Sequence, residues 1–330
     1  MYFDITMPLA LFTITVVAVL LNKRLEGRLK ANFEEREFRV RDAVLLVAAI
    51  SVAISIIVFI PQMAIMAFFL FSYSMLLFIF TYAFSDTRKA RAQLFSLAFG
   101  IVSFAAATIS LLGFGTTSIM AYGTVALYCL SAFAFITFVY EKGRASIKER
   151  WYLAVLPPAL FVLLYLFYNN TAIWFPYLFN TYAIIFAVLV TLYLGTLFTW
   201  KTSLVFAGLL TVMDIILVLF TGSMVSAAIH VSSLGLPMLV SLPTIPLITT
   251  ARGNLFMSLG LGDFFFAGLL AIQTYKKFGR DLAVSSTIGM SLSFAVFEAF
   301  LLNYEFKAFP GTLMIICGWL PFVVWKKLKP

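Results

Sequence analysis

Residues 254–275 read NLFMSLGLGDFFFAGLLAIQTY, an apolar stretch of membrane-spanning length with a carboxylate, Asp263, almost at its centre. An ionised carboxylate is energetically costly in the hydrocarbon of a bilayer, so such a residue is expected to be functional and to have a partner. The preceding apolar stretch carries the obvious partner, Asp214. We therefore expect the rest of the chain to be arranged around these two acids.

The composition of the chain excludes a soluble globular protein. Of its 330 residues, 63% are hydrophobic and only 11% are charged, whereas soluble proteins usually have roughly 25% charged residues. With a mean hydropathy of +1.04, the chain is predicted to be an all-α polytopic membrane protein that forms one membrane domain. Cys129 and Cys317 both fall in apolar stretches, so we expect small buried hydrophobes and neither a disulfide nor a zinc framework.

Apolar stretches of about 17 to 25 residues predict eleven membrane spans. The first has no basic segment before it and no clear cleavage site, so we expect a retained span and not a signal peptide. The spans that meet at Pro61 and Gln62 have almost no loop between them, and one bent segment is an alternative there. The predicted spans are 5–21, 43–61, 63–84, 94–112, 119–140, 151–168, 178–199, 203–221, 254–275, 283–304 and 309–325.

The basic residues predict the orientation of these spans. All of the 23 Lys and Arg residues except Arg252 and Lys307 lie on alternate loops. The positive-inside rule then places the N-terminus outside and the C-terminus in the cytoplasm. The net charge of +9 is thus a signal of topology, and we expect the lipid bilayer and no nucleic acid as a partner.

Two loops differ from the others in composition. Loop 22–42 mixes five acids with seven bases, which favours a solvated connector over a short amphipathic helix at the membrane surface. Residues 222–253 have few charges, several β-branched residues, and prolines that include Pro237, Pro243 and Pro246. This pattern predicts an extended segment with an edge strand that could accept another chain by strand addition, and a packed loop is the alternative.

Three of the 14 acidic residues, Asp214, Asp263 and Glu298, lie inside predicted spans, where no Lys or Arg neutralises them. Asp214 is 11 positions from the inner end of its span, and Asp263 is 12 positions from the inner end of the next. At about 1.5 Å per residue both lie roughly 16 to 18 Å from the inner boundary, so adjacent antiparallel helices would bring them to one level. Glu298 lies nearer the outer end of its span, where we expect it to reach interfacial water.

Two carboxylates at one level do not easily both ionise, and they can share a proton. Aspartic proteases use this arrangement: one carboxylate acts as a base on bound water, and the other, protonated, polarises the scissile carbonyl. A transporter pathway for ions or protons, or two acids in a wet cavity, fits the polarity and depth equally well. Gly260 and Gly262, each costing a helix roughly 1 kcal/mol, favour close approach by a neighbouring helix or an extended substrate.

Three short motifs around these acids are Met213-Asp214, Gly260-Leu261-Gly262-Asp263 and Pro310-Gly311-Thr312-Leu313. As a set they resemble the signatures of the GxGD intramembrane aspartyl proteases, which are presenilin, signal peptide peptidase and their archaeal homologues. In that family the motifs read Tyr-Asp, Gly-x-Gly-Asp and Pro-Ala-Leu, and they lie on the sixth, seventh and ninth helices of a nine-helix core.

The resemblance is closer to signal peptide peptidase than to presenilin. The two aspartates are 49 residues apart, without presenilin's long cleaved loop, and the predicted orientation is that of signal peptide peptidase. Residues 258–263 with Ala267-Gly268 are similar to that branch, and 237–243 is similar in length and prolines to its strand-forming segment between the catalytic helices. The chain departs from the family where Met213 replaces tyrosine and Gly311-Thr312 replaces Ala-Leu.

The resemblance implies an aspartic endopeptidase that cuts transmembrane helical peptides in or near the bilayer, such as signal peptide remnants or type II membrane proteins. It implies no cofactor and no metal. Asp214 and Asp263 would activate water as the catalytic residues, and segment 237–243 would pair with an unwound substrate strand. The residues expected to bind substrate are Gly260, Gly262, Pro310, Gly311, Thr312, Leu313, Pro237, Leu239, Val240, Leu242 and Pro243.

Two alternatives stay open. The same carboxylates would serve a proton-coupled transporter or a channel, and the prepilin-type peptidases share the Gly-x-Gly-Asp motif. Zinc and Ser-His protease chemistries are not expected, because the only histidine is His230, in a predicted outside loop.

The family core also predicts a division of the chain. Counted back from residue 325, nine spans start near residue 63. Residues 1–62 are then an extra N-terminal transmembrane hairpin with a cytoplasmic loop, residues 63–200 hold the first helices of the core, and residues 201–330 hold the catalytic and C-terminal helices. The resulting prediction is a presenilin-like nine-helix core plus this hairpin, about 11 transmembrane helices, with a short β-prone segment between the catalytic helices.

Overall fold

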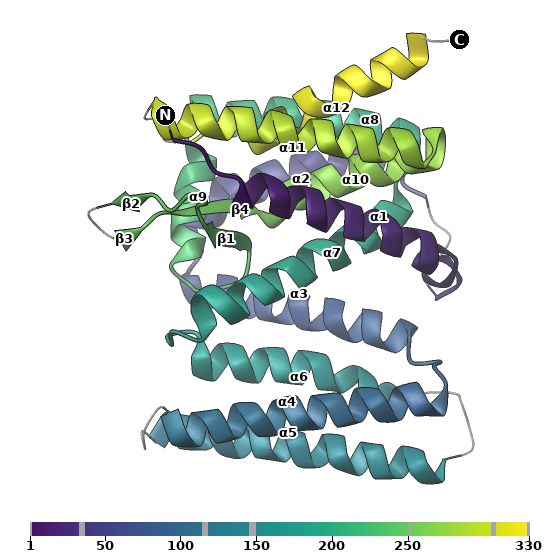
Figure 1. Ribbon diagram of the computed structural model, residues 1–330, viewed down its shortest axis with the longest axis vertical. Helices are drawn as coiled ribbons and strands as arrows, with labels where there is room; N and C mark the ends of the chain where they lie inside the picture. Colours follow the sequence, from purple (N-terminus) through teal and green to yellow (C-terminus); the bar gives the residue numbers. More distant parts are fainter. Residues whose placement is uncertain are drawn as a thin grey trace. The chain divides into compact units, whose positions relative to one another are not determined.

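The computed structural model (Figure 1) describes residues 2–32, 37–113, 118–144, 150–250, 253–304 and 308–328. These residues form twelve α-helices and two small two-stranded sheets. Within them, ten helices are long and apolar enough to cross a membrane, as expected of a multi-pass integral membrane protein but one fewer than the eleven predicted spans. The predicted span 254–275 is not among the ten, because its helix, Leu261–Phe278, is 18 residues long and carries three charged residues, Asp263, Lys276 and Lys277. The orientation of the spans stays a prediction, and Arg252 and Lys307, which bear on it, lie outside the described residues.

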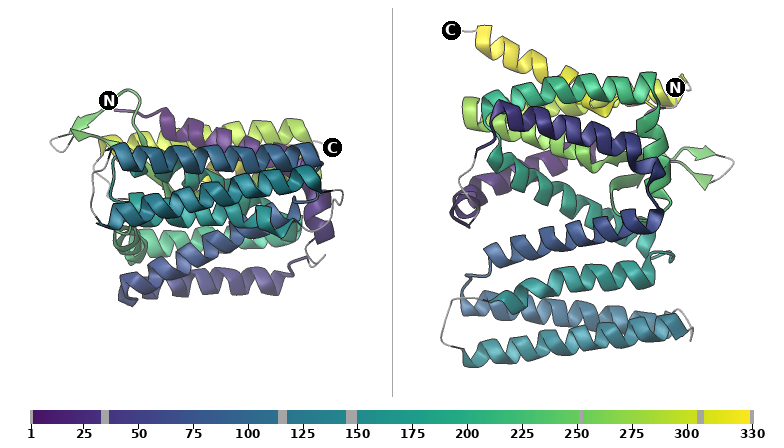
Figure 2. Two further views of the ribbon diagram at one scale, coloured as in Figure 1. Left: turned by 90° about the horizontal axis from the view of Figure 1, so that it is seen from below. Right: turned by 180° about the vertical axis from the view of Figure 1, so that it is seen from behind.

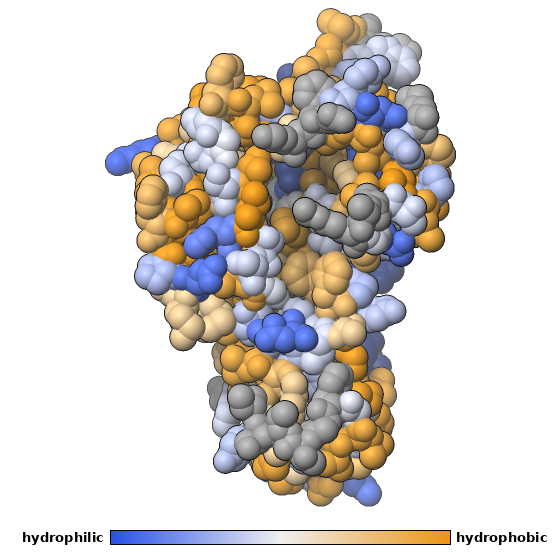
Figure 3. Space-filling model, turned by 90° about the vertical axis from the view of Figure 1, so that its left-hand side faces the viewer, coloured by the Kyte–Doolittle hydropathy of each residue, from blue (hydrophilic) through white to orange (hydrophobic). Residues whose placement is uncertain are grey.

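Large apolar side chains are exposed on the surface of the protein (Figure 3), and Phe59 and Leu112 are 85% and 81% exposed. Soluble proteins rarely expose extensive apolar patches, whereas lipid solvates them without cost. Cys129 and Cys317 are exposed free thiols, so the expectation that both are buried was wrong. An apolar span has a lipid-facing side as well as a core-facing side, and hydropathy does not tell the two apart.

One of the two compact units of the chain is Met66–Phe175, which is a bundle of helices. Its helices are α3 (Gln62–Ala83), most of which belongs here, α4 (Lys89–Gly113), α5 (Ser118–Gly143) and α6 (Trp151–Tyr168). Small buried residues, including Gly100 and Ala107, recur along one face of α4. Ser131 of α5 donates a hydrogen bond to the carbonyl of Gly100 at 2.9 Å. The small residues thus let these helices approach closely.

The second unit, Met1–Ile65 with Pro176–Pro330, is built around the helix that begins at Leu261. Its elements are α1 (Thr6–Asn32), α2 (Val40–Ile56), η1 (Ile57–Phe59), α7 (Phe179–Leu197), α8 (Trp200–Ile215), η3 (Ile216–Phe220), α9 (Ser223–Ser232), α10 (Leu261–Phe278), α11 (Arg280–Asn303) and α12 (Gly311–Leu328), with η2 (Trp174–Leu178) leading into α7. Residues 264–274 of α10 are all buried, which is the pattern of a helix enclosed by others. It packs against α1, α7, α8, α11 and α12.

The described part of residues 1–62, predicted as a hairpin added to the core, packs within this unit, and the division at residues 62 and 200 stays a prediction. α1 lies against α7, α10 and α11, and its Met7 and Leu11 are each 1% exposed. Hydropathy identifies a segment that spans a membrane, but it does not identify the neighbours of that segment, because lipid and protein interior are similarly apolar.

Glycines decide how closely some helices of this unit approach. Gly289 of α11 and Gly318 of α12 face one another, and a β-carbon on either would clash with the backbone of the other. Gly268 of α10 lies against Thr191 of α7, where a β-carbon would also clash. These contacts bring the backbones of α11 and α12 together and seat the side chain of Thr191 against the backbone of α10, which positions α10 and α12 at the candidate site.

Two short antiparallel sheets lie between α9 and α10 in the sequence. In the larger one Leu239 faces Gly260 and Ser241 faces Ser258, and the strand predicted within 237–243 is present. The smaller one forms a hairpin tip that projects away from the helices of this unit (Figure 2). The pairs are β1 (Leu239–Pro243) with β4 (Phe256–Gly260), and β2 (Thr249–Thr250) with β3 (Gly253–Asn254).

Three boundaries differ from prediction. Asn254 and residues 256–260 belong to strands and not to the start of a helical span, because a short apolar run does not distinguish a strand from a helix. Residues 223–232, in the segment predicted to be extended, form α9. α1 continues to Asn32, so loop 22–42 begins as a helix and not as a connector; its Lys, Arg and Glu residues are good helix formers. At Pro61 the prediction of two spans is confirmed over one bent segment, because α2 with η1 ends before this residue and α3 begins after it.

Candidate functional site

Asp214 and Asp263 lie on neighbouring antiparallel helices at matching depth. The start of α8 and the end of α10 are side by side, since the ring centroids of Trp200 and Phe278 are 5.2 Å apart. From this common end Asp214 is 14 residues along α8, and Asp263 is 15 residues back along α10. At about 1.5 Å per residue both are roughly 20 Å from it. The depth match is retained although α10 begins at Leu261, which puts Asp263 in its first turn and not at the centre of a span.

Both carboxylates line one cavity of about 130 Å³. Its walls are mostly apolar, and Ser51 and Thr312 are the only other polar side chains among its lining residues. The cavity is large enough for water, and the carboxylate oxygens supply the polar partners that buried water needs. The lining residues are Ile50, Ser51, Ile54, Phe206, Leu210, Met213, Asp214, Leu217, Met224, Gly260, Gly262, Asp263, Phe265 and Thr312.

Thr312 orients Asp214. Its backbone N–H and its hydroxyl both donate to Oδ2 of Asp214, at 3.1 Å and 2.6 Å. α12 begins at Gly311, so the N–H of Thr312 is one of the first in that helix and has no partner within it. The carboxylate thus takes the place of a helix cap, where the positive end of the helix dipole also favours it. No described residue donates a hydrogen bond to Oδ1 of Asp214, which leaves that oxygen for water or substrate.

Glycines surround Asp263. A β-carbon at Gly311 would lie 2.5 Å from Oδ1 of Asp263, and one at Gly260 would lie 3.3 Å from Oδ2. The carboxyl group also interacts with the backbone N–H of Gly260 and with the charge of Asp214. Gly262 differs from these two, because a β-carbon there would meet nothing within 4 Å. Gly311 therefore makes room for Asp263 itself, whereas Gly262 leaves open space in the cavity.

The start of α12 thus joins the two acids, Thr312 through hydrogen bonds to Asp214 and Gly311 through its contact with Asp263. These are the two positions at which the chain departs from the Pro-Ala-Leu motif. The threonine hydroxyl supplies a donor that a leucine could not. Met213 lines the cavity but brings no hydroxyl.

The structure brings together some of the predicted substrate-binding residues. Gly260, Gly262 and Thr312 line the cavity, and Gly311 is in contact with Asp263. Val240 is completely buried in β1 and faces the protein interior. The predicted residues that do not line the cavity are Gly311, Pro310, Leu313, Pro237, Leu239, Val240, Leu242 and Pro243.

Asn180 of α7 is absent from the predicted site residues, yet it holds β1 in place. Its Nδ2 donates to the carbonyl of Ser241 at 2.6 Å, and the N–H of Ser241 donates to its Oδ1 at 2.7 Å. The signal for it in the sequence is an amide inside an otherwise apolar span, which requires a partner.

The contact with Asn180 also shows how the strands pair at this point. The N–H and carbonyl of Ser241 point toward Asn180 and not toward β4, so the N–H and carbonyl of the opposite residue, Ser258, point away from β1.

Two other predicted features lie apart from the cavity. Glu298 does not reach water: it is 1% exposed, neither of its carboxylate oxygens has a hydrogen-bond partner among the described residues, and the charge of Asp4 acts on it. His230 lies on α9, with Nε2 3.4 Å from the carbonyl of Ile60. The described part of the chain contains no group of three or more metal-binding side chains.

A scan of the chain against protein-family models finds no match, and a search of curated proteins finds none either.

Proposed function

We propose that the protein is a membrane-embedded aspartyl protease of the GxGD type, which hydrolyses peptide bonds of transmembrane segments. The observation that carries this proposal is the shared cavity: two carboxylates from different helices, at one depth, line one largely apolar space of about 130 Å³. Their common contact with the start of α12 further supports it. The motif resemblance is consistent with the same chemistry.

The two acids have different surroundings, which suggests different roles. Asp214 accepts two hydrogen bonds from Thr312, and such donors favour the ionised form of a carboxylate. Asp263 lies among glycines and apolar side chains, and its charge is opposed by that of Asp214. In the proposed reaction Asp214 takes a proton from water as the water oxygen bonds to the carbonyl carbon, while Asp263 donates a proton to the carbonyl oxygen. Asp214 then gives its proton to the nitrogen of the tetrahedral intermediate, the C–N bond breaks, and a hydroxyl of the intermediate returns a proton to Asp263.

The substrate would bind as an added strand. A peptide bond within a transmembrane helix is inaccessible, and an unwound segment in the bilayer needs partners for its backbone groups. We predicted pairing with segment 237–243, but Asn180 occupies the outer edge of β1 at Ser241. We therefore propose the outer edge of β4, where Ser258 is exposed and Gly260 leads within three residues to Asp263.

The proposal is tested with the purified protein in detergent and a model transmembrane peptide, with fragments identified by mass spectrometry. Cleavage inside the apolar segment, lost in Asp214→Ala and Asp263→Ala, is expected. A cut only at the polar end of the peptide would favour a prepilin-type peptidase. No cleavage, together with pH-driven solute flux in proteoliposomes that both variants abolish, would instead assign the carboxylates to a transporter.

A further inference from the structure

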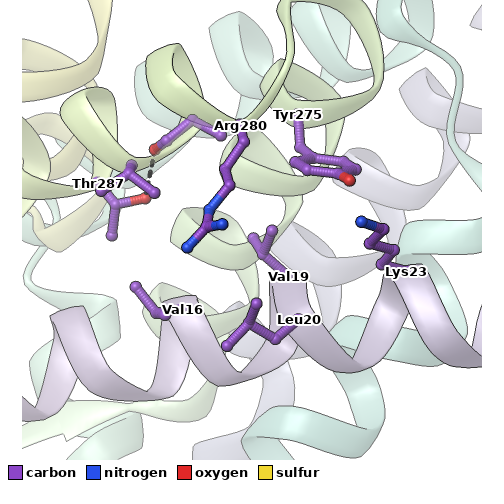
Figure 4. A pocket seen from close by; sticks show the side chains of 9 residues that line it. Val16, Val19, Leu20, Lys23, Tyr275, Arg280 and Thr287 are labelled. Carbon is purple, nitrogen blue, oxygen red and sulfur yellow. Dashed lines mark hydrogen bonds between the residues drawn. The ribbon is translucent and has the colours of Figure 1, made fainter.

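A groove at the opposite end of α10 from Asp263 is not used by the proposed reaction. It lies between α1, the end of α10 and the start of α11, and has a volume of about 160 Å³ (Figure 4). Its walls are apolar, formed by Val16, Val19 and Leu20 of α1 and by Ala283 and Val284 of α11. This is the end of the helices at which the sequence changes from apolar to basic, which is the level of lipid headgroups.

Two cations frame the groove. Arg280, the first residue of α11, extends into it toward α1, and Lys23 of α1 stands across from it beside the ring of Tyr275 (Figure 4). Neither cation forms an ion pair with any described residue. Of the acids on the same helices, Glu26 lies 2.9 Å from Lys276, and Asp281 follows Arg280 directly without lining the groove.

The groove thus combines an apolar floor with unneutralised positive charge, and this combination fits a molecule with an apolar chain and an anionic head. A guanidinium matches the oxygens of a phosphate with two parallel hydrogen bonds. A free anion would leave the apolar walls uncovered, whereas the head group of a zwitterionic lipid carries its own cation, which offsets the phosphate charge and repels Lys23 and Arg280.

We propose that this groove binds one anionic phospholipid, with its phosphate between Lys23 and Arg280 and the start of one acyl chain between Val16 and Val284. Basic residues dominate this side of the membrane, and anionic lipids are concentrated in the cytoplasmic leaflet, which is where the predicted orientation puts the groove. The bound lipid joins α1 to α10 and α11, so it stabilises the unit that contains the two aspartates.

The test uses the purified full chain, with thermal unfolding and native mass spectrometry at increasing phosphatidylglycerol or acyl-matched phosphatidylcholine. Phosphatidylglycerol should raise the unfolding temperature and bind as one retained lipid. Phosphatidylcholine should raise the unfolding temperature less and be retained less. In Lys23→Gln/Arg280→Gln the affinity for phosphatidylglycerol should fall at least tenfold. The matched control, Lys326→Gln/Lys327→Gln, removes two basic residues from the last turn of α12 and should bind like the wild type.

A second variant keeps the test decisive if the double variant does not fold. Val284→Trp fills the groove without altering its charge, and it should also lose the retained lipid. An undiminished phosphatidylglycerol response in either variant would overturn the proposal, as would equal binding of phosphatidylcholine. Equal protection by inorganic phosphate would overturn it too, because it would assign the cations to a free anion.

Discussion

Thr312 donates two hydrogen bonds to the same oxygen of Asp214, one from its backbone and one from its hydroxyl, at 3.1 Å and 2.6 Å. The second residue of the last helix therefore holds the side chain of an acid that lies 98 residues earlier in the chain. This relationship makes the start of α12 part of the candidate site, and several expectations depend on it.

Replacing Thr312 with valine removes the hydroxyl bond and keeps the backbone bond and the side-chain shape. A hydrogen bond to a charged group contributes roughly 1.5 to 3 kcal/mol, so kcat for a transmembrane peptide should fall about tenfold to a hundredfold, while Thr312→Ser retains most of it. Thr211→Val is the matched control, because the hydroxyl of Thr211 is buried without a partner among the described residues. A Thr312→Val enzyme as active as the control would contradict the role of this bond.

The glycines around Asp263 should respond differently to alanine. Gly311→Ala places a β-carbon 2.5 Å from Oδ1 of Asp263, so the carboxyl must move and kcat/KM should fall by about a hundredfold or more. Gly262→Ala places a β-carbon in open space and should cost less than about tenfold. Peptide cleavage assays on the two variants give the comparison, and the reverse order of effects would show that Gly311 does not make room for Asp263.

Asn180→Leu should loosen the sheet that leads into α10. The change leaves both backbone groups of Ser241 without their partner, at a cost of about 1 to 3 kcal/mol for each buried group. Hydrogen exchange at Ser241 should accelerate together with exchange in β4, while exchange in α4 and α5 of the other unit stays unchanged. Unaltered protection of Ser241 in the variant would mean that Asn180 is not what holds β1.

Glu298→Gln tests whether a buried acid outside the cavity influences the dyad. Its carboxylate oxygens are buried and lack hydrogen-bond partners among the described residues, so a neutral amide should leave the unfolding temperature unchanged or higher. The pH dependence of peptide cleavage should also match that of the wild type, because Glu298 does not line the cavity. A displaced pH optimum in this variant would place Glu298 in the proton chemistry of the site.

The match between predicted and observed depth shows why part of the site is readable from sequence. Helical rise is constant, so counting residues from a shared end places Asp214 and Asp263 at one level even though α10 starts seven residues later than predicted. The strand at 256–260 was not predicted, because its Phe, Met, Ser and Leu residues have no strand-specific pattern and its conformation depends on pairing with β1. Contacts such as Asn180 with Ser241 depend on packing between distant segments, which no local pattern specifies.

The central claim is that Asp214 and Asp263 together hydrolyse a peptide bond within the membrane. The most direct measurement is the cleavage rate of a transmembrane peptide by wild type, Asp214→Asn, Asp263→Asn and the control Thr211→Val, all shown to be folded by thermal unfolding. Each asparagine variant keeps the shape of the side chain but cannot share a proton, so both should be inactive while the control cleaves at the wild-type rate. Cleavage at the wild-type rate by either asparagine variant would contradict the claim.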